Sequence, residues 1–339
     1  MPQPVNDTAT GGHAPLETVL ELILVTYNRS ASLDNTLRQL AESPFARCRI
    51  TVLDNCSTDD TAAVTAFYRD KFPDFYVIRH PRNIGGDYNF LRAIEISTHR
   101  YTWIVCDDDN YDFTHADEVV SAITICKYDL IYVASRSSIQ LNCKSHGETT
   151  VKCLVLEGAH YHRGCTFWPA LIFQSNKYDN YCFHAAPNIF PSIKFINRSL
   201  VEDFSIYVAE YPLVIRSETS ASEVDPLEIY KAWVTNAALI KNFALRANVI
   251  EQHTVRGFFI SLAFWIAVER SKKASGYWKR LFDILFAVTP LQKMKLLLLL
   301  PVMIIPLPLP WLIRTRGLVY RLMGNKDASN LPPVESVQR

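Results

Sequence analysis

The stretch Tyr101-Thr-Trp-Ile-Val-Cys-Asp-Asp-Asp-Asn110 joins an apolar strand pattern to three consecutive carboxylates, Asp107, Asp108 and Asp109. Neighbouring carboxylates raise each other's pKa unless a cation neutralises them. Mg²⁺ and Mn²⁺ prefer oxygen ligands, and Mg²⁺ is commonly held by one or two carboxylates together with the phosphates of a substrate. The stretch therefore predicts a Mn²⁺ or Mg²⁺ site at the end of a buried strand. The alternative is an acidic loop at the start of the next helix, where carboxylates are also favoured.

Further strand patterns lie on both sides of this stretch, and helical patterns separate them. The expected strands are Glu21–Thr26, Arg49–Leu53, Phe75–Ile78 and Leu130–Ala134. Strands that alternate with helices predict an α/β fold built on a doubly wound, mostly parallel sheet. Ligands of such sheets bind outside the carboxyl ends of the strands. We therefore expect the polar strand ends, Thr26 to Asn28, Asp54 with Asn55, and the aspartate triplet, to gather at one edge.

Composition and missing motifs exclude several classes of protein. The net charge of +1 over 339 residues gives no global field for nucleic acid. Neither a Gly-x-Gly-x-x-Gly fingerprint nor a Walker loop follows the first strand, which argues against dehydrogenases and P-loop NTPases. The eight cysteines contain no Cys-x-x-Cys pair, and the polar N-terminus does not read as a signal peptide. These features indicate reduced thiols and a cytoplasmic location.

The C-terminal part has a different composition from the rest. Leu296–Ile313 carries no charge over 18 residues, but it contains four prolines, which break a regular helix. Residues 271–323 hold nine Lys or Arg against one acid, Asp283. Basic residues beside apolar segments bind anionic lipid at about 1 kcal/mol each. We therefore predict a peripheral, membrane-binding tail at the inner face of the cell membrane. A hairpin packed on the protein core and a true membrane span are the alternatives.

Four segments, taken in order, resemble the inverting glycosyltransferases of family 2 of the bacterial cell-surface polysaccharide type, which have the nucleotide-sugar-binding fold called GT-A. The resemblance rests on Val25–Asn28, Leu53–Asp59, Asn83–Gly86 with Asn89, and Trp103–Asp109. It covers about residues 20–135 firmly and the following part of the chain loosely.

The resemblance implies a role for individual residues. Tyr27 is expected to stack on the nucleotide base, and Asp54 or Asn55 to read the base edge. Asp108 is expected to approach the ribose, while Asp107 and Asp109 hold Mn²⁺ or Mg²⁺. The remaining residues expected to line the nucleotide are Thr26, Asn28, Asn83 and Asp107.

The general base is where this sequence departs from the family pattern. Many members carry a Glu-Asp or Asp base at the start of a helix some 15–20 residues before a strand like Ile206–Val208, and this chain has His184 to Asn188 in that window. His184 is our first candidate, because a histidine pKa lies near neutrality. Asp203, which follows Glu202 close to the strand, and Asp179 are the other candidates. Retaining chemistry stays open.

We accordingly expect a metal-dependent transferase that moves a sugar from a nucleoside-diphosphate sugar to a glycan or lipid-linked hydroxyl. The expected organisation is a disordered leader (1–18), a nucleotide-sugar-binding half (19–135), an acceptor-side half (136–223), a helical region with the membrane-binding tail (224–323) and a flexible C-terminus (324–339). Two alternatives remain: a nucleotidyltransferase, and a GT-A-like scaffold that has lost its base. The oligomeric state is not specified by the sequence.

Overall fold

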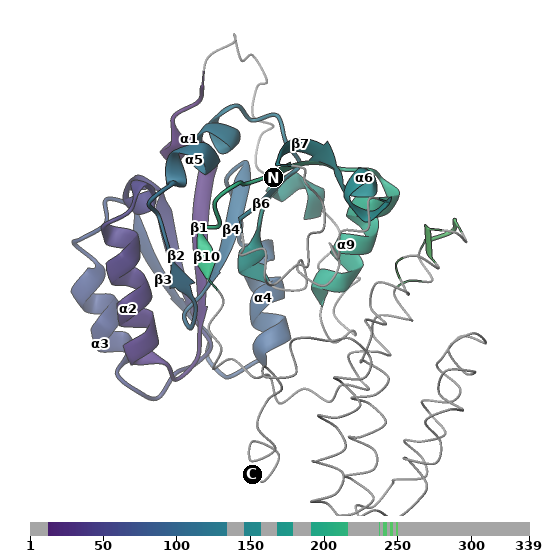
Figure 1. Ribbon diagram of the computed structural model, residues 1–339. Helices are drawn as coiled ribbons and strands as arrows, with labels where there is room; N and C mark the ends of the chain where they lie inside the picture. Colours follow the sequence, from purple (N-terminus) through teal and green to yellow (C-terminus); the bar gives the residue numbers. More distant parts are fainter. Residues whose placement is uncertain are drawn as a thin grey trace, which may run out of the picture. The chain divides into compact units, whose positions relative to one another are not determined.

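The computed structural model describes residues 13–133, 146–156, 168–178 and 191–215, with isolated positions between 237 and 249. The chain divides into two compact units, Met1–Ser220 and Ala221–Arg339, and the elements described below belong to the first (Figure 1). A short helix, α1, spans Leu16–Val19 at the end of the range expected as a leader. The predicted membrane-binding tail and the flexible C-terminus lie outside the described residues.

The first unit is built on an eight-stranded sheet with the order β3-β2-β1-β4-β8-β6-β9-β7. Its strands are β1 Leu20–Thr26, β2 Arg49–Asp54, β3 Phe75–Arg79, β4 Tyr101–Cys106, β6 Leu130–Tyr132, β7 Gly147–Thr150, β8 Leu171–Gln174 and β9 Ser205–Val208. A separate two-stranded sheet pairs β5, Asn110–Tyr111, with β10, Val214–Ile215.

The sheet is mixed rather than mostly parallel. Strands β1, β2, β3 and β4 are parallel to one another, as the alternating pattern predicts. Beyond them β8 runs antiparallel to both β4 and β6, and β7 runs antiparallel to β9. A buried apolar run has the same appearance in either direction, so the sequence pattern did not reveal these reversals.

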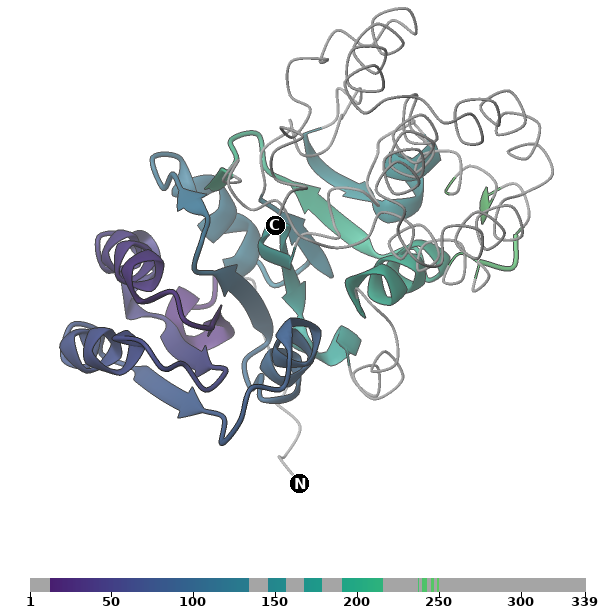
Figure 2. The ribbon, with the colours of Figure 1, turned by 90° about the horizontal axis from the view of Figure 1, so that it is seen from below.

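Helices cover the parallel half of the sheet on both faces. Helices α2, Ser30–Ala41, and α3, Thr61–Tyr68, lie side by side on one face, and α4, Gly86–Glu95, lies on the other (Figure 2). This arrangement follows from right-handed crossovers, because the chain moves outward from β1 to β3 and then returns to place β4 beside β1. The remaining helices are α5 Ala116–Thr124, α6 Val151–Leu156 and α9 Pro191–Val201.

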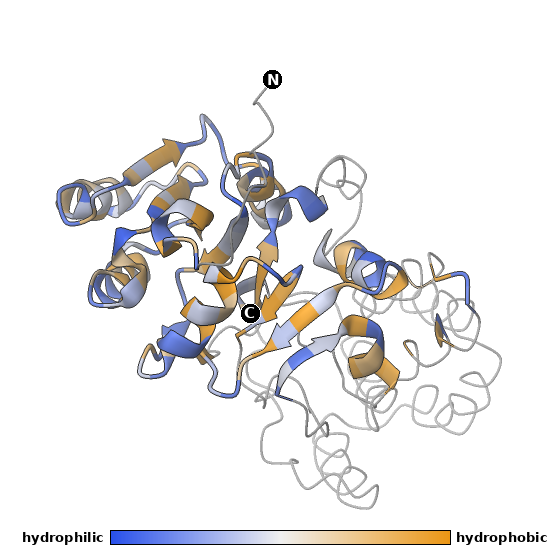
Figure 3. Cartoon of the chain, turned by 90° about the horizontal axis from the view of Figure 1, so that it is seen from above, coloured by the Kyte–Doolittle hydropathy of each residue, from blue (hydrophilic) through white to orange (hydrophobic). Residues whose placement is uncertain are grey.

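The core lies where β1 and β4 run through the middle of the sheet, since nearly all residues of these two strands are buried. Strongly hydrophobic stretches lie along strands of the sheet (Figure 3). All seven residues of β1 are buried. Trp103 of β4 is fully buried, packs edge-on against Phe45, and donates its indole N–H to the carbonyl of Pro169 at 2.9 Å. Its burial and its hydrogen bond fix the strand that ends in the aspartate triplet.

A buried polar cluster holds the opposite, amino end of these strands. Glu21 of β1 is 2% exposed and accepts hydrogen bonds from Ser97 Oγ and the backbone N–H groups of Thr98 and His99. Burial alone would raise its pKa, but the bonds from His99, Thr98 and Ser97 outweigh burial and lower the pKa. The carboxylate therefore anchors the turn between α4 and β4 to the central strand.

Among the described residues, no helix combines the length and apolar character needed to cross a membrane.

Candidate active site

The polar strand ends meet at the carboxyl edge of the parallel strands. Thr26 of β1 is in register with Asp54 of β2, and Val25 is in register with Cys106 of β4. The N–H of Asn55 donates to the carbonyl of Thr26, and the Thr26 hydroxyl donates to Asp107, so Asn55 and Asp107 flank the end of β1 from which Tyr27 continues. The gathering expected from the sequence is present.

The loop after β1 is tied to the loop after β2. Asn28 adopts a left-handed backbone, with φ of 51°, and its side-chain oxygen accepts the N–H of Thr58 at 2.7 Å. The N–H of Asn28 donates to Ser57 Oγ, and the N–H of Ser30 donates to Asp59. Burial raises the pKa of Asp59, but hydrogen bonds from Thr61 and Ser30 together outweigh burial and lower the pKa to about 2. These bonds fix the loop that presents Tyr27, whose ring is 42% exposed.

The two predicted base-edge residues are buried and hold the loops together. Asp54 is 2% exposed and accepts the N–H of Ser57 at 2.8 Å, while its second oxygen lies 3.7 Å from Nε of Arg79. The Asn55 amide donates to Asn83 Oδ1 and accepts the N–H of Ile84. Asn55 thus acts as a brace between two loops. Of the two residues, only Asp54 has a side-chain oxygen near a charged group, the guanidinium of Arg79.

The Asn55–Asn83 brace shapes the start of α4. Gly85 has φ of 88°, a left-handed value that L side chains rarely adopt, and its N–H donates to Asn83 Oδ1 at 2.8 Å. This backbone conformation favours glycine at position 85.

Asp107 is the most firmly held carboxylate of the triplet. It is 4% exposed and accepts the hydroxyl of Thr26 at 2.6 Å and a guanidinium N–H of Arg29 at 3.2 Å. Burial raises the pKa of Asp107 to about 6, although the bond from Thr26 and the charge of Arg29 act in the opposite direction. Thr36 of α2 donates to the backbone carbonyl of the same residue.

Asp108 and Asp109 turn their carboxylates toward a common point. Their ligand atoms and the sulfur of Cys106 all lie within 4.8 Å of one another. Burial and the nearby aspartates raise the pKa of the Cys106 thiol, which keeps it protonated and a poor ligand for a hard cation. Two converging carboxylates fit the oxygen preference of Mn²⁺ and Mg²⁺. Of the two predicted ligands Asp109 belongs to this group, while Asp107 faces Thr26 and Arg29 instead.

The turn after the triplet is clamped by residues distant in the sequence. Tyr111 N–H donates to Gln39 of α2 at 3.0 Å, and the Tyr111 hydroxyl donates to the carbonyl of Cys106 at 2.9 Å. In the small sheet Ile215 pairs with Asn110, the residue after Asp109. The second half of the unit therefore helps to hold the carboxylates in place.

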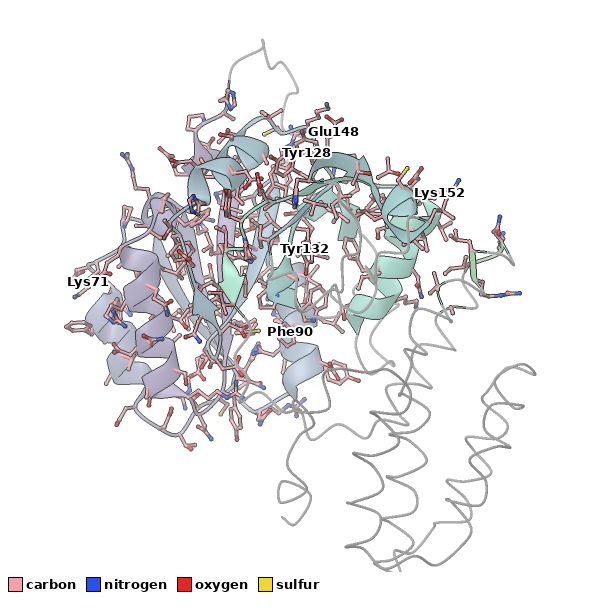
Figure 4. The ribbon with its side chains drawn as sticks, viewed as in Figure 1. Lys71, Phe90, Tyr128, Tyr132, Glu148 and Lys152 are labelled. Carbon is pink, nitrogen blue, oxygen red and sulfur yellow. The ribbon has the colours of Figure 1, made fainter. Side chains whose placement is uncertain are left out.

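Of the three candidate bases, the structure describes only Asp203. Asp203 lies between α9 and β9. Strand β9 is parallel to β6, and β6 and β4 are both antiparallel to β8, so β9 runs in the same direction as β4. Because Asp203 comes before β9, it lies at the amino edge of the sheet. Its carboxylate accepts the N–H of Lys152 near the start of α6 (Figure 4). It also has φ of 53°, which a turn aspartate tolerates. Asp203 is thus a turn and helix-capping residue at the edge away from the triplet, and the base role does not fit it. His184 and Asp179 lie outside the described residues.

Sequence reasoning missed Arg29 as part of the site. Its NH1 atom bridges Asp107 at 3.2 Å and Asp108 at 2.6 Å, and its side chain is 51% exposed. Burial opposes the charge, but the two aspartates raise the pKa of Arg29. The sequence does contain a signal for this role of Arg29. Three adjacent carboxylates need a counter-charge, and Arg29 directly follows Tyr27 and Asn28, which were expected at the same edge.

Three comparisons with known proteins agree with this arrangement. Residues 21–203 match glycosyl transferase family 2. Over 95 residues the chain is 32% identical to the abequosyltransferase RfbV of Salmonella typhimurium, a match that spans 27% of this chain and 28% of that protein.

Among solved structures, residues 1–349 of S. aureus TarS superpose with a TM-score of 0.60 at 17% identity, covering 92% of this chain and 88% of that one. A mannosyltransferase from Pyrobaculum calidifontis, PcManGT, solved with GDP-Man and Mn²⁺, has a TM-score of 0.51 at 12% identity, covering 96% and 91% of the two chains. At these identities the likeness establishes the GT-A-type fold. Because the family match covers more than half of the chain, the protein belongs to glycosyl transferase family 2.

Proposed function

We propose that this protein transfers a sugar from a nucleoside-diphosphate sugar to a hydroxyl of a glycan or lipid-linked acceptor, with inversion and with the help of Mn²⁺ or Mg²⁺. The observation that carries the proposal is the convergence of the Asp108 and Asp109 carboxylates at the carboxyl edge of the sheet, in a family 2 chain. TarS has been solved with UDP and with UDP-GlcNAc, which supports a nucleotide-sugar donor here.

The three aspartates at the carboxyl edge have different proposed roles. Asp109 and Asp108 would hold the divalent cation, which would stabilise the negative charge that grows on the departing nucleoside diphosphate. Asp107 is held by Thr26, so it orients the turn rather than supplying a third ligand. The buried setting of Asp107 and Asp109 strengthens these electrostatic interactions, because little water screens them.

The nucleotide binds across the ends of β1 and β2 in this proposal. Tyr27 presents an exposed ring for stacking on the base, and Asp54 with Arg79 lies at the base edge. Asn55 and Asn83 shape this wall indirectly through their mutual hydrogen bond. The loops are already bonded to one another, so little conformational entropy is lost when the nucleotide binds.

The acceptor side follows from the sequence. His184 is the proposed general base, since an imidazole titrates near neutral pH and can accept the acceptor's hydroxyl proton. The basic and apolar composition of residues 271–323 supports a peripheral location on the inner face of the membrane, where a lipid-linked acceptor is within reach.

The test is a calorimetric titration of UDP, GDP, dTDP and CMP, each with and without Mn²⁺, on the wild type and on Asp109→Ala. We expect one nucleotide to bind, only with Mn²⁺, and the variant to lose it. Binding of no nucleotide in either condition rejects the proposed site. Tight binding without transfer to any acceptor indicates a scaffold, and release of pyrophosphate indicates a nucleotidyltransferase.

Tyr27→Ala is expected to weaken binding of the selected nucleotide by roughly 5- to 100-fold, the range for losing one base–aromatic stack. Tyr27→Phe keeps the ring and should bind within about twofold of the wild type. The matched control is Tyr76→Ala on β3, a tyrosine of similar exposure outside the proposed site. An unchanged dissociation constant in Tyr27→Ala places the base elsewhere.

A further inference from the structure

The geometry points to Arg29 as an internal counter-cation that holds the metal-binding carboxylate Asp108 until the divalent cation arrives with the diphosphate, and then pairs with that diphosphate. This inference rests on the proposed function, because it assigns a positioning role at the same site.

Arg29 and a metal ion need the same carboxylate. A single guanidinium nitrogen of Arg29 lies 2.6 Å from Asp108 Oδ2 and 3.2 Å from Asp107 Oδ1. The carboxylate of Asp108 is also one of the groups that converge with Asp109. A divalent cation bound between Asp108 and Asp109 would lie within a few ångströms of the guanidinium, and like charges at that distance repel strongly.

The two aspartates that pair with Arg29 differ in how firmly they are held when the guanidinium moves away. Asp107 is 4% exposed and keeps its hydrogen bond from Thr26, so it stays in place. The Asp108 side chain is 25% exposed, so it can exchange one cation for another with less reorganisation. The ion pair with Asp108 is therefore the one that the metal breaks.

The released guanidinium has a partner close by. Arg29 follows Tyr27 by two residues, and its side chain is 51% exposed. A nucleotide stacked on Tyr27, with its diphosphate on a metal held by Asp109, passes beside this guanidinium. Its planar donors suit phosphate oxygens, which form short, charge-assisted hydrogen bonds with arginine.

The consequence is that the metal alone binds weakly and the metal together with a diphosphate binds well. Without the diphosphate, binding of Mn²⁺ would require Arg29 to leave Asp108, and the charge of Arg29 would then face the ion. With the diphosphate present, the same charge becomes favourable. Arg29 thereby couples the two binding events, and removing it should have opposite effects on them.

The experiment measures Mn²⁺ binding by the loss of the free-ion paramagnetic resonance signal, on the full chain. We compare the wild type with Arg29→Met, Arg29→Lys, Asp109→Asn and the control Arg92→Met. Arg92 is of similar exposure and pairs with Glu95 on α4. Arg29→Met is expected to bind Mn²⁺ alone roughly five- to tenfold more tightly than the wild type, as for loss of one competing ion pair of about 1 kcal/mol. The same variant should bind inorganic pyrophosphate with Mn²⁺ more weakly, by about tenfold.

Arg29→Lys keeps the charge and should stay near the wild type for Mn²⁺ alone, and Arg92→Met should not differ from it. Equal Mn²⁺ affinity in Arg29→Met and the wild type, or undiminished pyrophosphate binding, overturns the role of Arg29 while leaving an Asp109-dependent metal site intact. Mn²⁺ binding that survives Asp109→Asn overturns the metal site and this inference together. A thermal melt of each variant with and without Mn²⁺ verifies folding, and Mn²⁺ should stabilise Arg29→Met more than the wild type.

Discussion

Asp109→Asn is expected to abolish Mn²⁺-dependent nucleotide binding and to lower sugar transfer by roughly a thousandfold, the upper range for losing one preorganised electrostatic group. Asn keeps the shape of the side chain and one oxygen, so the 2%-exposed site does not lose packing. It removes the negative charge, however, and a neutral amide is a weaker ligand for Mn²⁺ or Mg²⁺ than a carboxylate. Transfer kinetics and calorimetric nucleotide binding measure the two effects.

The matched control for this prediction is Asp112→Asn. Asp112 lies three positions along the same segment and accepts the N–H and hydroxyl of Thr114 in a turn, and an asparagine oxygen can accept the same bonds. We expect this variant to transfer sugar within about twofold of the wild type, because surface substitutions away from the site have small effects. If the two variants behave alike, the loss in Asp109→Asn cannot be assigned to the metal site.

The sequence predicted the parts of the fold that depend on local pattern. The four strands expected at Glu21–Thr26, Arg49–Leu53, Phe75–Ile78 and Leu130–Ala134 appear within one or two residues of these bounds. These predictions succeed because apolar periodicity reports burial directly. The gathering of Tyr27, Asp54 and Asp107 also followed, since the ends of parallel strands share one edge of a sheet.

The parts that failed depend on contacts between distant residues. Pairing of Ile215 with Asn110 joins residues far apart in the sequence, and no local pattern marks it. Asp203 was a candidate base because it follows Glu202, although it lies closer to the strand than the family pattern places the base. Position in the sequence does not show at which edge of the sheet a residue lies. The edge at which Asp203 lies depends on the direction of β8, because a reversed strand changes which loops reach the carboxyl edge of the sheet.

Arg29 was overlooked for a similar reason. Its position after Tyr27-Asn28 marks only the end of a strand, whereas its contacts with Asp107 and Asp108 span the edge from β1 to β4. The charge balance of the triplet predicted that a cation must be present, and the sequence reasoning assigned this need wholly to a metal. The structure shows that the protein also supplies a cation of its own.

Glu21→Ala is expected to lower the free energy of unfolding by about 3–5 kcal/mol, or to lower the melting temperature by roughly 10 °C. The substitution removes the acceptor shared by the Thr98 and His99 N–H groups and the Ser97 hydroxyl, in hydrogen bonds that are partly buried. An unsatisfied buried donor costs about 1–3 kcal/mol, and this change affects three donors. Glu17→Ala is the control, because Glu17 is half-exposed and its ion pair with Arg47 is 3.9 Å long. We expect Glu17→Ala to change the stability by less than about 0.5 kcal/mol.

The contribution of Glu21 should also depend on pH, with a direction that follows from its lowered pKa. A carboxylate whose pKa is lower in the folded state than in the unfolded chain stabilises the fold above its ordinary pKa of 4.5. This stabilisation is lost as the pH falls below 4.5 through the folded-state value. Chemical denaturation of the wild type and of Glu21→Gln, which cannot titrate, should therefore show a stability difference that is constant near neutral pH and shrinks below 4.5. A difference that grows on acidification would show that Glu21 is not held as a carboxylate, and that the amino end of β1 is stabilised by packing alone.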